Sequence, residues 1–157
     1  MKKRKLTKGE QRNREEYVAF LCSQFTGLKF YQTPDQEEYD FHLYNDSKIK
    51  VMAEVKIRTS IYPDWFIAQK KIDWLLGTCE HFKAVPWFLV YCLFNRTLYK
   101  LNLRNLEYYE PRDGEMLNTE LENPEIEKGK FVLLKHWQVI DPSAPSEDLP
   151  RGRLDWK

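Results

Sequence analysis

Two neighbouring runs of alternating apolar and polar residues constrain the fold of this chain more than any other feature of its sequence. Every second residue is apolar in YDFHLY at 39–44, and IKVMAEVKIR at 49–58 repeats the pattern. Strict alternation is typical of a strand that buries one face. The four residues NDSK at 45–48, which separate the runs, have the composition of a tight turn. The sequence therefore predicts an antiparallel β-hairpin.

The length of the turn decides which side chains of this hairpin share a face. With a three-residue loop, Asn45 faces Ile49 and Asp40 lies directly opposite Glu54. A two-residue loop would shift the pairing by one residue and point Glu54 through the opposite face. We favour the first register because it gathers one apolar set on the core side: Tyr39, Phe41, Leu43, Val51, Ala53 and Val55.

In the favoured register, Asp40, Glu54 and Lys56 lie on one face in an arrangement that suits phosphodiester hydrolysis. Opposed residues have Cβ atoms about 4.5 to 5.5 Å apart, so two carboxylates can share a hard cation such as Mg²⁺, with Mn²⁺ as a substitute. The ion would polarise phosphorus and activate water, and the ammonium would stabilise the developing negative charge. The spacing alone also fits a solvated sheet face with a cross-strand ion pair.

Two helices are expected around this hairpin. Apolar residues at three- and four-residue steps predict a helix over 8–26, whose stripe is Tyr17, Val18, Leu21, Cys22 and Phe25. Gly27 is suited to end it. A second helix is expected over 65–78, with Asp64 as its cap.

Further strands are expected at 28–32, at 86–94 and at 97–103. The run at 86–94 is almost unbroken in its apolar character, which is typical of a strand buried on both faces. Beyond Tyr109 the pattern weakens into an acidic loop that ends at Gly129, before a short strand at 130–134. The order of elements predicts an α/β fold in which helices pack against a mixed sheet.

The 157 residues suit one domain, which we divide into a basic arm at 1–8, a core at 9–103 and an acidic, proline-rich remainder at 104–157. Three widely spaced cysteines do not make a disulfide framework and favour a reducing compartment. No apolar run approaches the roughly 20 residues that cross a bilayer. We expect a cytoplasmic protein with no membrane partner and no disulfide-linked partner.

Asp40, thirteen further residues and then Glu54-Val55-Lys56, placed between two helices, resemble the PD-(D/E)xK nuclease superfamily, which has the restriction-endonuclease-like fold. The order helix, three strands, helix, strand over residues 8–94 resembles the core of that fold. The resemblance implies a Mg²⁺-dependent nuclease that acts on DNA in recombination, in repair or in phage or mobile-element processing. It implies Asp40, Glu54 and Val55 as the metal site and Lys56 as the residue that orients the water.

The sequence departs from the family pattern at one position, because Tyr39 and not proline precedes Asp40. A literal Pro34-Asp35 pair lies five residues earlier. We favour Asp40 since Asp35 falls in a connection before the strand alternation begins.

Members of the superfamily often carry an acidic residue on the first helix and a Gln or Lys on the second. The resemblance implies Glu15 as a further catalytic participant, with Glu10 and Glu16 as alternatives, and Gln69 with Lys70 on the second helix. Basic side chains near the site and on the first helix are expected to bind DNA phosphates: Arg58, Lys70, Lys71, Arg12 and Arg14.

The resemblance also implies a homodimer, since two copies can address two strands. Two other classes of function stay open. One is a nucleic-acid-binding module that has this fold without catalysis. The other is a protein-interaction module that uses its aromatic surface and the acidic segment 107–127.

Overall fold

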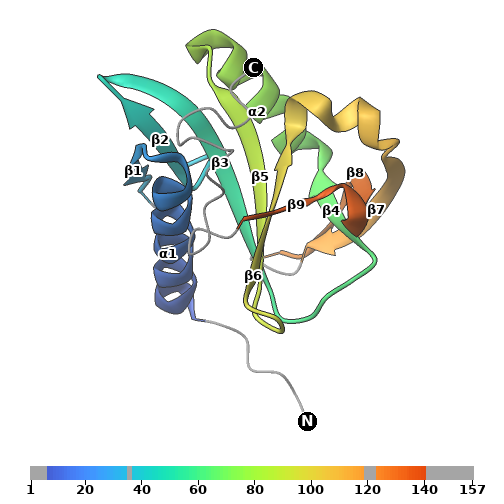
Figure 1. Cartoon of the computed structure of the whole chain (residues 1–157). Helices are drawn as coiled ribbons and strands as arrows, with labels where there is room; N and C mark the ends of the chain where they lie inside the picture. The colour runs from blue at the N-terminus through green and yellow to red at the C-terminus, as the bar shows by residue number, and fades with distance from the viewer. Residues whose placement is uncertain (1–6, 35–36, 119–122, 141–157) are drawn as a thin grey trace.

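A six-stranded mixed sheet forms the centre of the computed structural model, which describes residues 7–34, 37–118 and 123–140 (Figure 1). Its strand order is β1-β2-β3-β5-β6-β9. β3 and β5 run parallel, and the other neighbouring strands run antiparallel. The strands are β1 (Lys29–Gln32), β2 (Phe41–Asn45), β3 (Lys48–Arg58), β5 (Val85–Cys92), β6 (Thr97–Asn102) and β9 (Gln138–Ile140).

Helix α1 (Lys8–Thr26) covers one face of this sheet, over β1, β2 and β3 (Figure 1). It begins with a capping box between Thr7 and Glu10 and ends at Gly27, whose φ of 79° is left-handed. The predicted bounds of this helix are confirmed. Tyr17 was expected in its buried stripe but is 46% exposed, because Val18 and Ala19 take the positions that face the sheet.

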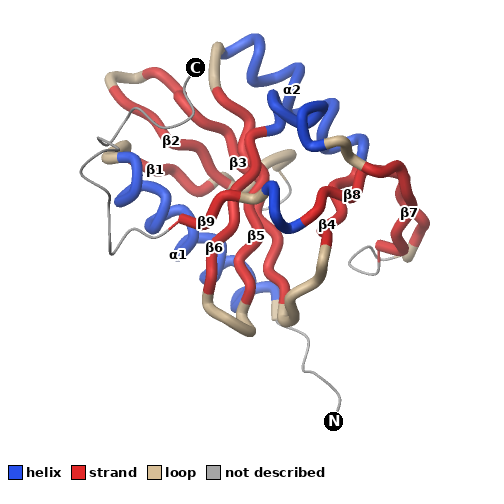
Figure 2. Tube along the Cα trace, turned by 45° about the vertical axis from the view of Figure 1, so that its right-hand side comes forward, coloured by secondary structure: helices blue, strands red, loops and turns tan. Residues whose placement is uncertain are grey.

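The opposite face carries helix α2 (Gln69–Phe82) and a second, three-stranded sheet of order β4-β8-β7 (Figure 2). Its strands are β4 (Asp64–Ala68), β7 (Arg112–Asn118) and β8 (Glu125–Leu133). The short helices η1 (Leu103–Tyr109) and η2 (Leu134–His136) complete this layer, and β5 is buried along its whole length between the two layers, as predicted. Among the described residues, no helix combines the length and apolar character needed to cross a membrane.

The second helix begins later than the sequence pattern predicted, because residues 64–68 form β4. Trp65 and Ile67 are buried on one side of that strand, and its backbone pairs with β8. Asp64 therefore does not cap a helix and instead accepts a hydrogen bond from the guanidinium of Arg112 at 3.4 Å. The secondary structure of this segment depends on pairing with a strand that is distant in the sequence, and the local residues do not indicate that pairing.

The prediction of an acidic loop that ends at Gly129 is also wrong, because most of this segment forms the β7–β8 hairpin. β7 has no buried residue, and β8 buries only Gly129 and Val132. Apolar alternation records burial, so a hairpin held mainly by its backbone hydrogen bonds leaves little trace in the sequence.

The β2–β3 turn has two residues and not the predicted three. Asp46 and Ser47 have φ values of 49° and 64°, the left-handed conformation of the tightest hairpin turns. Asn45 consequently pairs with Lys48, and not with Ile49.

A β-bulge at Lys50 then restores the predicted register. Lys50 has no partner in the β2–β3 ladder, so that Phe41 pairs with Ala53 beyond the bulge. The N–H of Asp40 donates to the carbonyl of Ala53 at 2.9 Å. The ladder ends at this pair, and its register continued by one residue sets Asp40 opposite Glu54.

The same bulge moves Ile49 to the other face of the sheet, where Ile49 packs in the α2 layer. Tyr39 also lies there and stacks on Trp74 with ring centroids 5.8 Å apart. Tyr39 was expected among the side chains of the α1 layer. That layer keeps the rest of the predicted set: Phe41, Leu43, Val51, Ala53 and Val55.

Close packing of β8 against β4 makes Gly129→Ala strongly destabilising. A Cβ at Gly129 would lie 2.2 Å from the carbonyl oxygen of Ile67, a backbone atom that cannot move away without breaking the β4–β8 pairing. We expect the free energy of unfolding, measured in urea, to fall by about 2 kcal/mol or more.

Gly77→Ala is the matched control, because a Cβ within α2 at Gly77 meets nothing within 4 Å. It should raise the free energy of unfolding by about 0.5 to 1 kcal/mol. A Gly129→Ala protein as stable as the wild type would contradict the described contact.

Candidate active site

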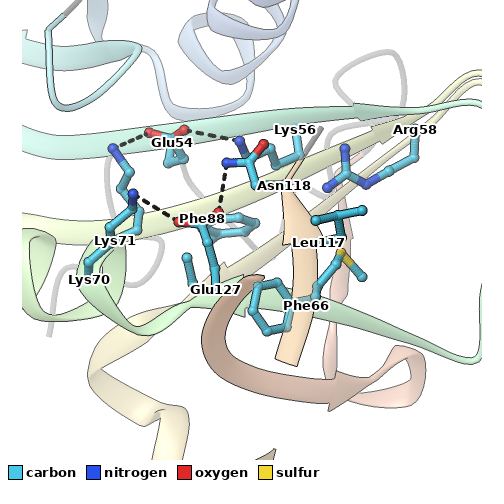
Figure 3. Close-up of a pocket in the computed structure, with 12 residues that line it drawn as sticks. Glu54, Lys56, Arg58, Phe66, Lys70, Lys71, Phe88, Leu117, Asn118 and Glu127 are labelled. Atoms are coloured by element: carbon cyan, nitrogen blue, oxygen red, sulfur yellow. Dashed lines mark hydrogen bonds and ion pairs between the residues drawn. The ribbon is translucent and has the colours of Figure 1, made fainter. Parts of the chain in front are cut away.

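A cleft of about 350 Å³ opens beside the central strand β3, at the place where the sequence predicted the site (Figure 3). β3 contributes Glu54, Lys56 and Arg58 to one wall. The other walls come from α2 and the second sheet, and their polar residues are Lys70, Lys71, Asn118 and Glu127. Alternation along β3 points its three side chains to one side of the strand.

Glu54 is 7% exposed and is held between two ammonium groups. The Nζ of Lys71 lies 3.2 Å from Oε2, and the Nζ of Lys56 lies 3.8 Å from Oε1 (Figure 3). Burial raises the pKa of Glu54 to about 7, and the negative charge of Asp40 acts in the same direction. The two lysines lower that pKa without cancelling the cost of burial.

Asp40 lies at the residue before β2 and turns toward β3. Its Oδ2 accepts a hydrogen bond from the N–H of Val55 at 2.7 Å. Burial raises the pKa of Asp40 to about 6, and the charge of Glu15 adds to this effect. In an extended strand the N–H and C=O of one residue point to the same edge, so the carbonyl of Val55 also faces this end of β2.

Glu15 brings a third carboxylate toward the site from α1. It is 6% exposed, and burial raises its pKa, with the charge of Glu54 acting in the same direction. Gln11 donates a hydrogen bond to it at 3.4 Å. Of the alternatives, Glu10 serves the helix cap and Glu16 is exposed.

The donor set fits a hard divalent cation. Within the described ranges no group of three or more His, Cys, Asp or Glu side chains could hold a metal ion. Asp40 and Glu54 would therefore supply two carboxylates, and the other ligands would have to be backbone or water oxygens. The side chain of Val55 is buried in the α1 layer, and only its carbonyl can be a ligand. Two carboxylates and a carbonyl, completed by water, match the preference of Mg²⁺. Burial is the main cause of the raised pKa of both acids, with a neighbouring carboxylate adding to it, and a bound cation would favour their ionised forms.

The three predicted residues of α2 differ in whether they contact Glu54, line the cleft or do neither. Lys71 contacts Glu54 and donates to the carbonyl of Glu38. Lys70 lines the cleft and pairs with Glu127 at 2.9 Å. The side-chain amide of Gln69 donates to Asp73 at 2.9 Å and does not line the cleft.

Of the predicted basic residues outside α2, one lies in the cleft and two lie on α1. Arg58 lines the cleft. Arg12 ties α1 to the end of β1, because its guanidinium donates to the carbonyl of Thr33 at 2.9 Å, and Arg14 is exposed on α1. The rival aspartate, Asp35, lies outside the described residues.

Sequence reasoning missed the wall that the hairpin provides. Asn118 donates a hydrogen bond to Glu127 at 2.7 Å, and the two residues stand across the cleft from β3 (Figure 3). Both fall in the segment that was expected to be a loop. No motif marks them, and only the β7–β8 pairing brings them to the site.

Comparison with known proteins agrees with this architecture. A family model described as "Phage putative PDDEXK endonuclease" matches residues 2–114. The chain belongs to this family. No curated protein matches this PDDEXK chain.

Two solved structures are similar to this member of the phage PDDEXK family. The Archaeoglobus fulgidus Holliday junction resolvase Hjc has 12% sequence identity and a TM-score of 0.53, with 80% of this chain and 90% of Hjc covered. D212, a nuclease from a fusselovirus, has 12% identity and a TM-score of 0.52, with 90% and 93% covered. The predicted superfamily and its restriction-endonuclease-like fold are confirmed.

The buried acids of this PDDEXK site make the metal-free protein less stable at high pH. Folding raises the pKa of Asp40 from 3.8 to about 6, so its ionisation opposes folding above about pH 6. This cost disappears as the pH falls from 6 toward 4. We expect Asp40→Asn, measured by urea unfolding in EDTA, to raise the free energy of unfolding by about 1 kcal/mol at pH 8, with the gain shrinking toward pH 4.

Asp46→Asn in the exposed hairpin turn is the matched control, and it should change the stability by less than about 0.5 kcal/mol. An Asp40→Asn protein that is less stable than the wild type at pH 8 would show that the carboxylate is compensated in the metal-free fold.

Proposed function

We propose that this chain is a Mg²⁺-dependent nuclease that hydrolyses phosphodiester bonds in DNA. The observation that carries the proposal is that Glu54 and Lys56 line one cleft, while the N–H of Val55, the residue between them, holds the carboxylate of Asp40. Membership of a PDDEXK family supports the same chemistry. The Holliday junction resolvase and the viral nuclease that share the fold support DNA as the substrate class, in recombination or in phage DNA processing.

Asp40, Glu54 and the carbonyl of Val55 would hold the ion. When bound, Mg²⁺ supplies Lewis acidity at phosphorus and lowers the pKa of a coordinated water. The protein contributes orientation: the N–H of Val55 fixes Asp40, and Lys71 fixes one oxygen of Glu54.

Lys56 is the residue assigned to the reacting phosphate. Its ammonium lies 3.8 Å from the second oxygen of Glu54 and lines the cleft, so it can hold the attacking water and offset charge that develops on the phosphoryl oxygens. Arg58 and Lys70, on two walls of the same cleft, are placed to contact the flanking phosphates of the strand. A homodimer would present two such clefts to a duplex.

Replacing Lys56 by alanine should remove cleavage while leaving binding. We expect the rate of DNA cleavage in Mg²⁺ to fall at least about a hundredfold, because a charge stabiliser of the transition state is lost. Binding in Ca²⁺ should change little, since Arg58 and Lys70 remain. A panel of duplex, branched and single-stranded DNA, tested with the purified proteins, gives both measurements.

Lys135→Ala, which removes an exposed lysine from η2, should cleave as the wild type does. Equal cleavage by the wild type and Lys56→Ala would remove the proposed mechanism. DNA binding without cleavage in any divalent metal would favour a catalytically inactive module on this fold.

Metal binding has a readout that does not depend on cleavage. An ion that binds only the folded protein raises its stability, by about 2.7 kcal/mol at a concentration 100 times its Kd. Thermal unfolding of the wild type should therefore shift upward with Mg²⁺ or Mn²⁺ and return with EDTA. Glu54→Gln should lose this shift.

Glu127→Gln is the control from the same cleft, because Glu127 lies on the hairpin wall and pairs with Lys70. It should keep the shift. An undiminished shift in Glu54→Gln would place the bound metal elsewhere.

A further inference from the structure

Five aromatic rings form a continuous row on the α2 side of the sheet. Trp74 of α2 stacks on Tyr39, and Tyr39 lies 6.0 Å from the ring of His42, between ring centroids. His42 contacts Tyr31 of β1 at 5.2 Å and Tyr44 of β2 at 5.8 Å. We call Trp74, Tyr39, His42, Tyr31 and Tyr44 the aromatic row; no step of the proposed hydrolysis uses it.

The outer end of the aromatic row is a groove. A hollow of about 330 Å³ is lined by Tyr31, His42, Tyr44, Ser47 and Ile49. This volume is at the lower end of the range for small-ligand pockets. Tyr31 is 50% exposed, and none of the five lining residues is acidic. The groove offers flat ring surfaces with hydroxyl and imidazole groups at their edges.

The inner end of the aromatic row lies near residues of the candidate active site, although none of its five rings lines the cleft of Glu54 and Lys56. His42 follows Asp40 by two residues, about 7 Å along the chain. The Tyr39 hydroxyl and the His42 Nδ1 are hydrogen bonded at 3.0 Å. On α2, Trp74 follows Lys71, the partner of Glu54, by three residues and so lies on the same side of the helix.

Positive charge lies at the outer end of the row. Lys29 pairs with Tyr44 across the β1–β2 ladder, and directly opposed residues share a face. At the inner end the ammonium of Lys71 is already paired with Glu54. Ring faces with a lysine at their outer end suit a ligand that carries flat bases and phosphates, and they suit an apolar protein partner less well.

We propose that the groove binds unpaired bases of a nucleic-acid strand whose backbone passes through the candidate active site. Aromatic faces stack on any nucleobase, but the bases of an intact duplex are already stacked and cannot enter. The preferred substrate therefore has a single-stranded segment, such as a flap, a gap or a frayed end, next to the phosphate that is cut. This inference rests on the proposed function and names the substrate class of the same site.

The test is binding of fluorescein-labelled oligo-dT to the full chain in EDTA, followed by anisotropy. We expect Tyr31→Ala and Tyr44→Ala each to weaken binding about tenfold, because each removes one stacking face. Tyr44→Trp should retain the affinity. An oligonucleotide of abasic sites keeps the phosphates and removes the bases, and it should bind the wild type and the alanine variants equally weakly.

Tyr108→Ala is the matched control, since Tyr108 is 84% exposed on η1 and lies outside the groove. It should bind oligo-dT as the wild type does. Circular dichroism and the Tyr44→Trp protein separate loss of stacking from loss of folding. A parallel response of oligo-rU to the same variants would also support base stacking.

Alanine variants that bind oligo-dT with unchanged affinity would overturn the inference, as would an equal loss of affinity for the abasic strand. If the variants leave DNA binding unchanged but lower the mass of the DNA-free protein in analytical ultracentrifugation, the groove is instead a contact between two copies of the chain. Because the assay contains no metal, it is independent of hydrolysis. If the chain binds bases in this way but never cleaves DNA, the inference about the groove stands and the proposed nuclease function is wrong.

Discussion

The β-bulge at Lys50 is the constraint on which the rest of this structure depends. The two-residue turn between β2 and β3 would by itself set a register in which Glu54 lies on the face opposite to Asp40. One unpaired residue in β3 corrects this, so that a single shift places the apolar side chains of both strands against α1 and opposes Asp40 to Glu54. Core and site are thus consequences of one local irregularity, and neither could be moved without the other.

The site lies where β2 and β3 separate. The pairing of β3 with β2 ends at Ala53, and beyond it Glu54 and Lys56 pair with β5 on one edge only. On the other edge the N–H of Val55 donates to the side chain of Asp40. Burial raises the pKa of three carboxylates, which come from α1, from the residue before β2 and from β3, and each of them also raises the pKa of another. Ionising these buried acids opposes folding, and a bound divalent cation would offset that cost.

The sequence predicts the part of this structure in which burial is periodic. Helix α1, the β2–β3 hairpin and β5 each bury one face or both, and their patterns gave nearly the observed bounds. Segments whose structure is decided by a distant partner were not predictable: β4 is a strand because it pairs with β8, and β7 forms although all its residues are at least partly exposed. The same reason hid Asn118 and Glu127. Alternation placed Asp40, Glu54 and Lys56 on one face, and the family resemblance supplied the roles that we assign to them.

The position of β4 gives the two sides of the cleft a shared mechanical support. β4 pairs with β8, which carries the hairpin wall, and it continues without a loop into α2, which carries Lys70 and Lys71. The wall formed by β7 and β8 and the two lysines of α2 are therefore joined through the five residues of β4. A change in the backbone of β4 would disturb both sides of the cleft together.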